Sequence, residues 1–255
     1  MGILLERVDA WLIALGFTAA MLTAWLVGRW IARRNLTDLE HDPGVKFTDA
    51  SMALLGLLLG FTFSMALTRH EQRRLAMVSE SNAIGDFYTC ASLLKEPHRT
   101  KLRAVIHEYA EQKLEVTRGV LSEAKLETAI QRFQALQTRM TQIVADILVE
   151  GTPIAVSLTN TLNGVSSTSA SRLAAYRDRL PKSIVLLLLL SSTIPAFLMG
   201  QQKGASKKLH VAGTFSFILL VTLVIDVTLD LNQPGKGAIM VSQEPMERLI
   251  RSMSN

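Results

Sequence analysis

The stretch that decides the fold runs from Asp49 to Glu80 and reads DASMALLGLLLGFTFSMALTRHEQRRLAMVSE. Its first part, Ala50–Thr68, holds nineteen residues without a charge, and at about 1.5 Å each they nearly cover a hydrocarbon core of about 30 Å. The charged part that follows contains no proline or turn signal. We therefore predict one helix that crosses a membrane and continues into water, with Arg69, Arg73 and Arg74 at the exit.

Two faces can be distinguished on this predicted span. One carries small side chains at every fourth residue and lets another backbone approach closely. Its members are Gly56, Gly60, Ser64 and Thr68. Beside it lies an apolar face, which we call the neck face. Its members are Ala53, Leu57 and Phe61. Both faces fit ordinary helix packing, and the alternative is that the neck face lines a dry, narrow pore.

The rest of the chain divides into apolar and polar parts. Of the 255 residues, 49% are hydrophobic and 19% are charged, which is too apolar for disorder and too charged for a protein confined to a membrane. Three more uncharged runs, Ala10–Gly28, Ser183–Gln202 and Val211–Ile225, are candidate spans, and the segment from Arg69 to Lys182 is polar with helical periodicity. We predict an all-α protein with four transmembrane spans and a helical extramembrane layer continuous with spans two and three.

The predicted segments follow from this division. They are a first span with its connecting loop (1–48), a second span extending into the helical layer (49–182), the third and fourth spans (183–232) and a C-terminal tail (233–255).

We interpret the first run as a retained span. It is long, holds two tryptophans and ends in GRWIARR instead of a small-residue cleavage site, unlike a signal peptide. It carries a stripe of small residues that could pack closely against the stripe of the second span. The members of this stripe are Gly16, Ala20, Ala24 and Gly28. In the polar connection that follows, Thr48 or Asp49 is the expected N-cap of the second span.

The polar segment predicts helices separated by turn residues. The long second helix should end near Pro97, and another should run from about Thr100 to Gly119. A heptad pattern from Leu126 to Ile147 predicts a third, and the Ser- and Thr-rich stretch from Ile154 to Leu180 predicts a weaker one. The layer is therefore expected to be antiparallel and helical.

Few residues suggest chemistry. Asp226 and Asp230 stand one helical turn apart, and because a carboxylate in hydrocarbon costs about 2.5 kcal/mol or more, both are acidic site candidates. The alternatives are that Asp230 simply meets water and that Asp226 pairs with Arg69 or Lys182. The single Cys90 cannot form an intrachain disulfide, and no Cys/His spacing suggests a metal. We recognise no nucleophile–base pair that would indicate an enzyme, and we expect no cofactor. The formal charge of +5 implies no nucleic acid, because the basic residues gather at span ends, near lipid headgroups.

Three blocks stand in the order LLGLLLGFTFSMALTRHEQRR, VSESNAIGDFYTCASLLKEPHRTKLRAVIHEY and LDLNQPGKGAIMVSQEPMERLI. This order resembles the bestrophin-like domain family of bacterial membrane proteins over about residues 48–254. The run LGFTFSMALTR also resembles the pore helix of bestrophin anion channels, which would put the neck face at their apolar rings. The run DLNQPG lacks the acidic cluster that binds calcium in bestrophins, so calcium gating is not implied.

The resemblance implies a multi-pass, homo-oligomeric ion channel, a pentamer as in bestrophins, in a bacterial inner membrane. Its partners would be membrane lipid, further copies of the chain and inorganic ions. Arg69 and Arg73 near one mouth would favour anions, whereas Asp226 and Asp230 would favour cations if they faced the pore. The alternative is a membrane-anchored helical interaction module, similar to a stator, that does not conduct.

Two opposite signals leave the orientation open. The two short loops carry basic residues, so the positive-inside rule places them in the cytoplasm. The resemblance to bestrophins implies the reverse.

Overall fold

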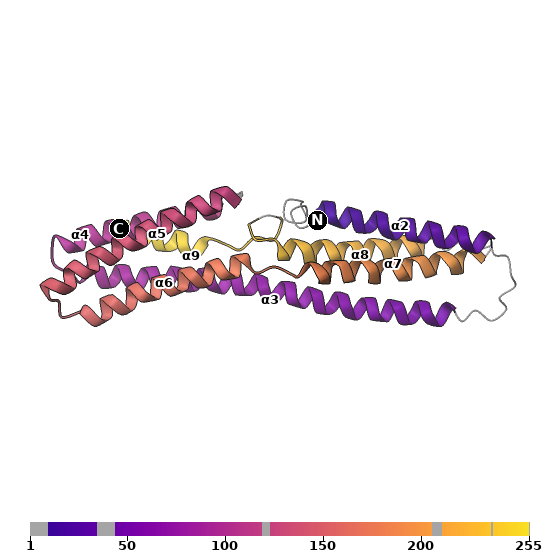
Figure 1. Cartoon of the computed structure of the whole chain (residues 1–255), viewed down its shortest axis with the longest axis horizontal. Coiled ribbons are helices and arrows are strands. Elements are labelled where there is room, and N and C mark those ends of the chain that lie inside the picture. The colour runs from indigo at the N-terminus through magenta and orange to yellow at the C-terminus, as the bar shows by residue number, and fades with distance from the viewer. Residues whose placement is uncertain (1–9, 35–43, 119–122, 206–210, 236, 255) are drawn as a thin grey trace. The chain divides into compact units, whose positions relative to one another are not determined.

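The computed structural model describes residues 10–34, 44–118, 123–205, 211–235 and 237–254, and these form helices and their connections (Figure 1). The helices are α2 (Ala10–Arg34), α3 (Gly44–Ser92), α4 (His98–Arg118), α5 (Glu123–Glu150), α6 (Ala155–Arg177), α7 (Lys182–Ala205), α8 (Val211–Asn232) and α9 (Glu244–Met253). Four helical segments of the described chain are long and apolar enough to cross a membrane. The prediction of an all-α protein with four spans is therefore confirmed.

Helix α3 is 49 residues long and runs unbroken past Arg69, as the absence of proline and turn residues predicts. Its expected N-cap is wrong, because Thr48 and Asp49 lie inside a helix that already includes Gly44. The segment from Gly44 to Asp49 contains no proline, so nothing in it prevents the helix from beginning before the uncharged run.

The chain forms two compact units. The membrane unit takes in Met1–Arg69 and Arg179–Ile239, and the extramembrane unit takes in His70–Asp178 and Met240–Asn255. In the membrane unit α2 packs along α7 and α8 (Figure 1). Apolar side chains from these three helices and from the first part of α3 form its core. They include Phe17, Met21, Leu55, Leu59, Leu188, Ile218 and Ile225.

In the membrane unit α2 and α7 approach each other closely. A Cβ placed on Gly28 would overlap the carbonyl oxygen of Phe197, and one placed on Gly200 would overlap that of Trp25. The two backbones therefore touch where only glycine leaves room. Within the chain, Gly28 makes its close contact with α7 rather than with the small-residue stripe of the second span.

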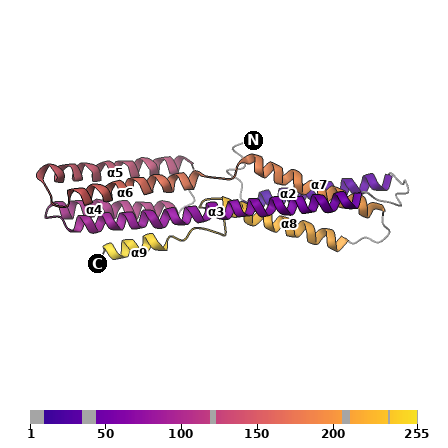
Figure 2. The same ribbon diagram turned by 90° about the horizontal axis from the view of Figure 1, so that it is seen from below.

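The extramembrane unit contains the second part of α3 together with α4, α5, α6 and α9 (Figure 2). Its core follows the predicted heptad of α5 and takes side chains from all five helices. They include Phe87, Ile106, Tyr109, Met140, Ile147, Leu158 and Met246. Helix α5 ends at Glu150, before Gly151, whose φ of 84° lies in the left-handed region that favours glycine.

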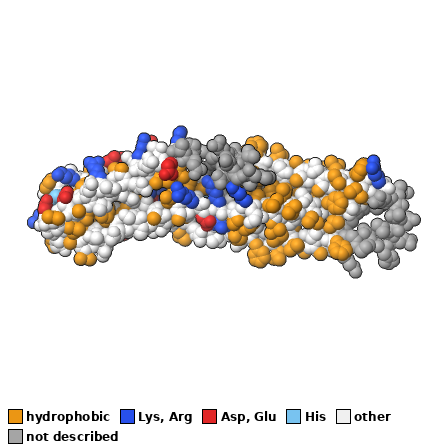
Figure 3. Space-filling view, in the orientation of Figure 1, with side chains coloured by type: hydrophobic (Ala, Val, Ile, Leu, Met, Phe, Trp, Pro, Cys, Tyr) orange, Lys and Arg blue, Asp and Glu red, His pale blue; other side chains and the backbone are white. Residues whose placement is uncertain are grey.

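The surfaces of the two units differ as the sequence predicts. In Figure 3, hydrophobic side chains cover much of the visible surface of the membrane unit, and charged side chains lie on that of the extramembrane unit. Large exposed apolar residues of the membrane unit include Trp11, Leu26, Leu57, Phe61, Leu190 and Leu219. A surface of this kind fits lipid or other protein better than water.

Candidate functional site

The neck face of α3 is exposed in the part of the chain that the structure describes. Phe61 is 61% exposed and Leu57 is 56% exposed, and Ala53 is also exposed. On another side of the same helix, Leu55 and Leu59 are buried in the core of the membrane unit. One side of α3 is thus fixed by packing while the neck face is left for another chain, lipid or a pore.

The small-residue stripes are largely open as well. A Cβ placed on Gly16, Gly56 or Gly60 would meet no atom within 4 Å. Ser64 is exposed, while Ala20 and Ala24 are half-buried. Packing through Gly56 and Gly60 would therefore require a second subunit, and the packing role of these positions stays a prediction.

The two arginines predicted at the pore mouth have different surroundings. Arg69 is half-buried, and Arg73 is buried. The guanidinium of Arg73 donates from Nε to the carbonyl oxygen of Ala175 at 3.2 Å and from Nη2 to that of Asp178 at 2.8 Å. These carbonyls end α6, and a cation there is favourable because the last carbonyls of a helix lack helical partners. The sequence did not indicate this capping role.

Asp230 holds the connection that follows α8. Its carboxylate accepts hydrogen bonds from the backbone N–H groups of Ala238 at 3.0 Å and Ile239 at 2.9 Å. Gly237 has a φ of 102°, and a Cβ at this residue would overlap the Asp230 carboxylate. Asp230, an acidic site candidate, therefore has a structural role, and this role requires glycine at position 237.

Asp226 lies one turn earlier on α8 and is half-buried. A further turn back, the hydroxyl of Thr222 shares a hydrogen bond of 2.8 Å with that of Thr18 on α2. The sequence-predicted acidic pair is therefore placed on one stretch of α8, but its two members differ in surroundings. In the described part of the chain, no three His, Cys, Asp or Glu side chains are grouped so that they could hold a metal ion.

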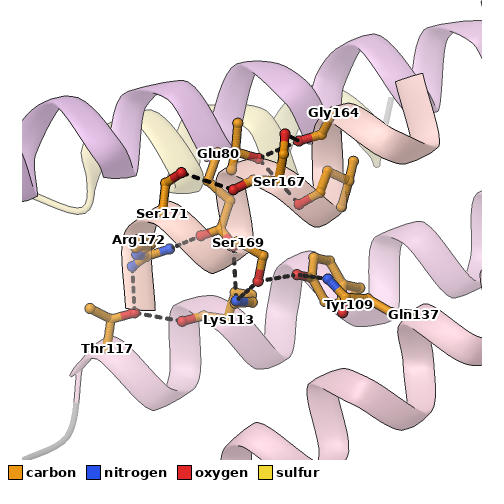
Figure 4. A network of polar contacts seen from close by, with 12 residues as sticks. Glu80, Tyr109, Lys113, Thr117, Gln137, Gly164, Ser167, Ser169, Ser171 and Arg172 are labelled. Atoms are coloured by element: carbon orange, nitrogen blue, oxygen red, sulfur yellow. Dashed lines mark hydrogen bonds and ion pairs between the residues drawn. The ribbon is translucent and has the colours of Figure 1, made fainter. Parts of the chain in front are cut away.

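A buried polar network joins α3, α4 and α6 in the extramembrane unit (Figure 4). The fully buried carboxylate of Glu80 lies 2.8 Å from Nζ of Lys113 and also pairs with the guanidinium of Arg172. Lys113 donates to Oγ of Ser169 at 2.9 Å, and the hydroxyl of Tyr109 donates to the same oxygen at 3.1 Å. One carboxylate is thus neutralised by two cations from two other helices.

The network extends outward from Arg172. Its Nη2 donates to the hydroxyl of Thr117 at 3.0 Å and to the side-chain carbonyl of Gln243 at 3.3 Å. Gln243 immediately precedes α9. The segment that leads into the C-terminal helix is therefore hydrogen-bonded to the same cluster.

Burial and charge act in opposite directions on these groups. Burial alone would raise the pKa of Glu80, but the charges of Lys113 and Arg172 outweigh it and hold that pKa below its usual value. Burial lowers the pKa of Lys113, although Glu80 opposes this. Burial, with the charge of Glu80, raises the pKa of Tyr109. Glu80 is therefore ionised and Tyr109 neutral at pH 7.

The sequence reasoning missed this network, although a signal for it is present. Glu80 falls on the same face of α3 as Met77, Ile84 and Phe87, which are all buried. A carboxylate on an otherwise apolar helix face requires a buried partner. The sequence does not show which cations supply it, because Lys113 and Arg172 are distant along the chain.

Together these observations define a four-span, all-helical membrane protein with a helical extramembrane unit. The model of the bestrophin-like domain matches residues 14–246, and the chain belongs to this family. A mutant of a bacterial bestrophin homologue from Klebsiella pneumoniae is similar in structure, with a TM-score of 0.68 at 12% identity over 94% of this chain and 95% of that one. A second mutant of this homologue has a TM-score of 0.66 at 14% identity, over 92% of this chain and 97% of that one. No protein with a curated description matches.

Proposed function

We propose that the chain forms a homo-oligomeric ion channel in which α3 of each subunit lines the pore and the neck face forms a hydrophobic constriction. The observation that carries this proposal is the exposure of Phe61 and Leu57 on a helix whose other side is anchored in the core. Membership of the bestrophin-like family supports it. A ring of apolar side chains resists wetting and so holds back ions without any catalytic chemistry.

The proposal extends to the surroundings of the pore. We place the oligomer, a pentamer by analogy with bestrophins, in a bacterial inner membrane, with lipid around it. Arg69 contributes one positive charge per subunit near a pore mouth, which favours anions by Coulomb attraction. Asp230 opposes this less than its charge suggests, since its carboxylate is engaged by two backbone N–H groups.

The test uses the side chain of Phe61. Phe61→Ala removes aromatic bulk from every subunit, so a pore constricted there should wet more readily and ion flux should rise. The measurement is conductance in planar bilayers, or flux from liposomes, and the reversal potential in a KCl gradient gives the sign of selectivity. Leu57→Ala should raise flux in the same way, as the second ring.

Phe63→Ala is the matched control, because residue 63 lies about 200° around the helix from residue 61. If Phe61 were only a packing residue, Phe61→Ala would leave a cavity that costs roughly 3–5 kcal/mol and would give no gain in flux. Zero flux in the parent and in all three variants, from protein shown to be folded and inserted, would end the channel proposal in favour of a non-conducting interaction module.

A further inference from the structure

A cleft on the extramembrane unit is lined by cationic side chains and by one carboxylate, that of Glu96. It has a volume of about 380 Å³, and residues of α3, of α4 and of the end of α9 line it. On α4 the cationic or titratable residues are Arg99, Arg103 and His107. They are spaced four residues apart, which places them on one helix face. This size lies in the range of clefts that bind small molecules.

Arg103 is the central group of the cleft. Its guanidinium carbon lies 4.6 Å from the centre of the Tyr88 ring, and its Nη2 donates to the Tyr88 hydroxyl. That hydroxyl in turn donates to the carbonyl oxygen of Met253 at 2.8 Å. Within the described residues Arg103 has no carboxylate partner, so most of its five N–H donors have no protein acceptor. Tyr88 thus fixes the guanidinium in place without neutralising it.

The other charges of the cleft nearly balance. Arg99 pairs with Glu96 at 2.7 Å, on the surface, where such an ion pair is weak and easily shared. His107 lies 3.5 Å from Glu111 and 3.4 Å from the hydroxyl of Ser254. The unpaired charge is therefore that of Arg103, which suits a single anionic group.

We propose that this cleft binds the phosphate group of a small, soluble organic phosphate. A planar guanidinium recognises phosphate oxygens in a bidentate manner, and it exposes more donors than one carboxylate would use. The cleft is larger than a bare ion needs, and Ala104, Met253 and the Tyr88 ring offer apolar surface for the organic part. Because Tyr88 also holds Met253, an occupant would brace the end of α9.

Isothermal titration of the full chain in maltoside micelles tests this assignment, with phenyl phosphate, inorganic phosphate and acetate as probes. Phenyl phosphate should bind more tightly than inorganic phosphate, and acetate more weakly than either. Arg103→Gln should weaken phenyl phosphate binding tenfold or more, because a charge-assisted contact is lost. Arg139→Gln is the control, since Arg139 is an exposed arginine of α5 whose partner is Glu108.

A second variant guards against misfolding of the first. Ala104 is exposed, so Ala104→Phe should fill the cleft without touching its cations, and it should abolish binding while thermal unfolding stays unchanged. Phenyl phosphate that binds equally to the parent, Arg103→Gln and Ala104→Phe, or that does not bind to the parent, would overturn the site. Tighter binding of acetate than of phosphate would overturn the phosphate assignment, and competition by phosphatidylglycerol in mixed micelles would show a lipid headgroup instead of a soluble ligand.

Discussion

Glu80 shows how narrowly a single residue can be constrained. It is fully buried and ionised, and its charge is balanced by Lys113 and Arg172. Removing one partner of a buried ion pair leaves the others uncompensated in a medium of low dielectric constant. The network is therefore expected to tolerate little change at this position.

Glu80→Gln should lower the free energy of unfolding by roughly 3–5 kcal/mol, because the buried Lys113 and the partly buried Arg172 would lose their counter-charge. The measurement is denaturant or thermal unfolding of the full chain in detergent. Glu71→Gln serves as control, because Glu71 pairs with Arg74 on the surface and should change little. Equal unfolding curves for both variants would contradict the role given to Glu80.

The same residue predicts the behaviour in acid. The folded pKa of Glu80 is depressed below its usual value near 4.5, so the folded state binds fewer protons than the unfolded state. The stability that Glu80 contributes is therefore fully present above pH 4.5 and should be lost as the pH falls below it. In Glu80→Gln this part of the acid dependence should disappear.

For single residues, the sequence predicted where an unusual side chain lies along its helix better than it predicted which groups that side chain contacts. It placed Arg73 at the end of the second span, but its contact with the last carbonyls of α6 depends on residues about a hundred positions away. It likewise selected Asp230 as acidic, but the loop that folds back onto that carboxylate is set by Gly237. Local pattern identifies an unusual residue, whereas the fold determines what it contacts.

Among the helices, local periodicity was a sufficient guide to most elements. The heptad from Leu126 to Ile147 lies within α5, and the predicted break near Pro97 separates α3 from α4. These features depend on residues a few positions apart, which the sequence shows directly. The neighbour of α2 was harder to predict, because Gly28 on α2 could pack against small residues of more than one helix, and within the chain it meets α7.

The contact between α2 and α7 yields a prediction for a pair of helices. Gly200→Ala would force a methyl group onto the backbone of Trp25, and overpacking of this kind typically costs about 1–3 kcal/mol. Gly16→Ala is the control, because a Cβ there meets open space. Thermal unfolding in detergent should show a lower midpoint for Gly200→Ala alone. Identical midpoints would mean that the two backbones are not in contact.

For the whole molecule, the exposed faces of α3 are compatible with the proposed assembly. One copy of α3 cannot enclose a pore, and among the described residues the neck face is exposed and a Cβ on Gly56 or Gly60 would meet no atom within 4 Å. The family and the four spans were readable from the sequence, because a run of uncharged residues and an ordered set of motifs are local properties. The number of subunits was not, since it depends on the angle at which two copies meet.

Gly60→Leu should therefore weaken assembly, because it places four extra carbons where helices of two subunits are proposed to meet. Native mass measurement in mild detergent should find a symmetric oligomer for the parent and smaller species for the variant. Met65→Leu, at an exposed position of the same span, should assemble like the parent. A monomeric parent would count against assembly and against the channel together.

The hydrogen bonds of the Asp230 carboxylate shorten the flexible segment that tethers the C-terminal helix α9 to α8. Eleven residues connect the end of α8 at Asn232 to the start of α9 at Glu244. Because Asp230 fixes Ala238 and Ile239, only four residues stay between the fixed point and α9. The entropy of closing a flexible tether grows with the logarithm of its length, so this shortening favours the docked α9 by about 1 kcal/mol. The effective local concentration of the helix at its docking surface is then about fivefold higher, without any contact between Asp230 and α9 itself.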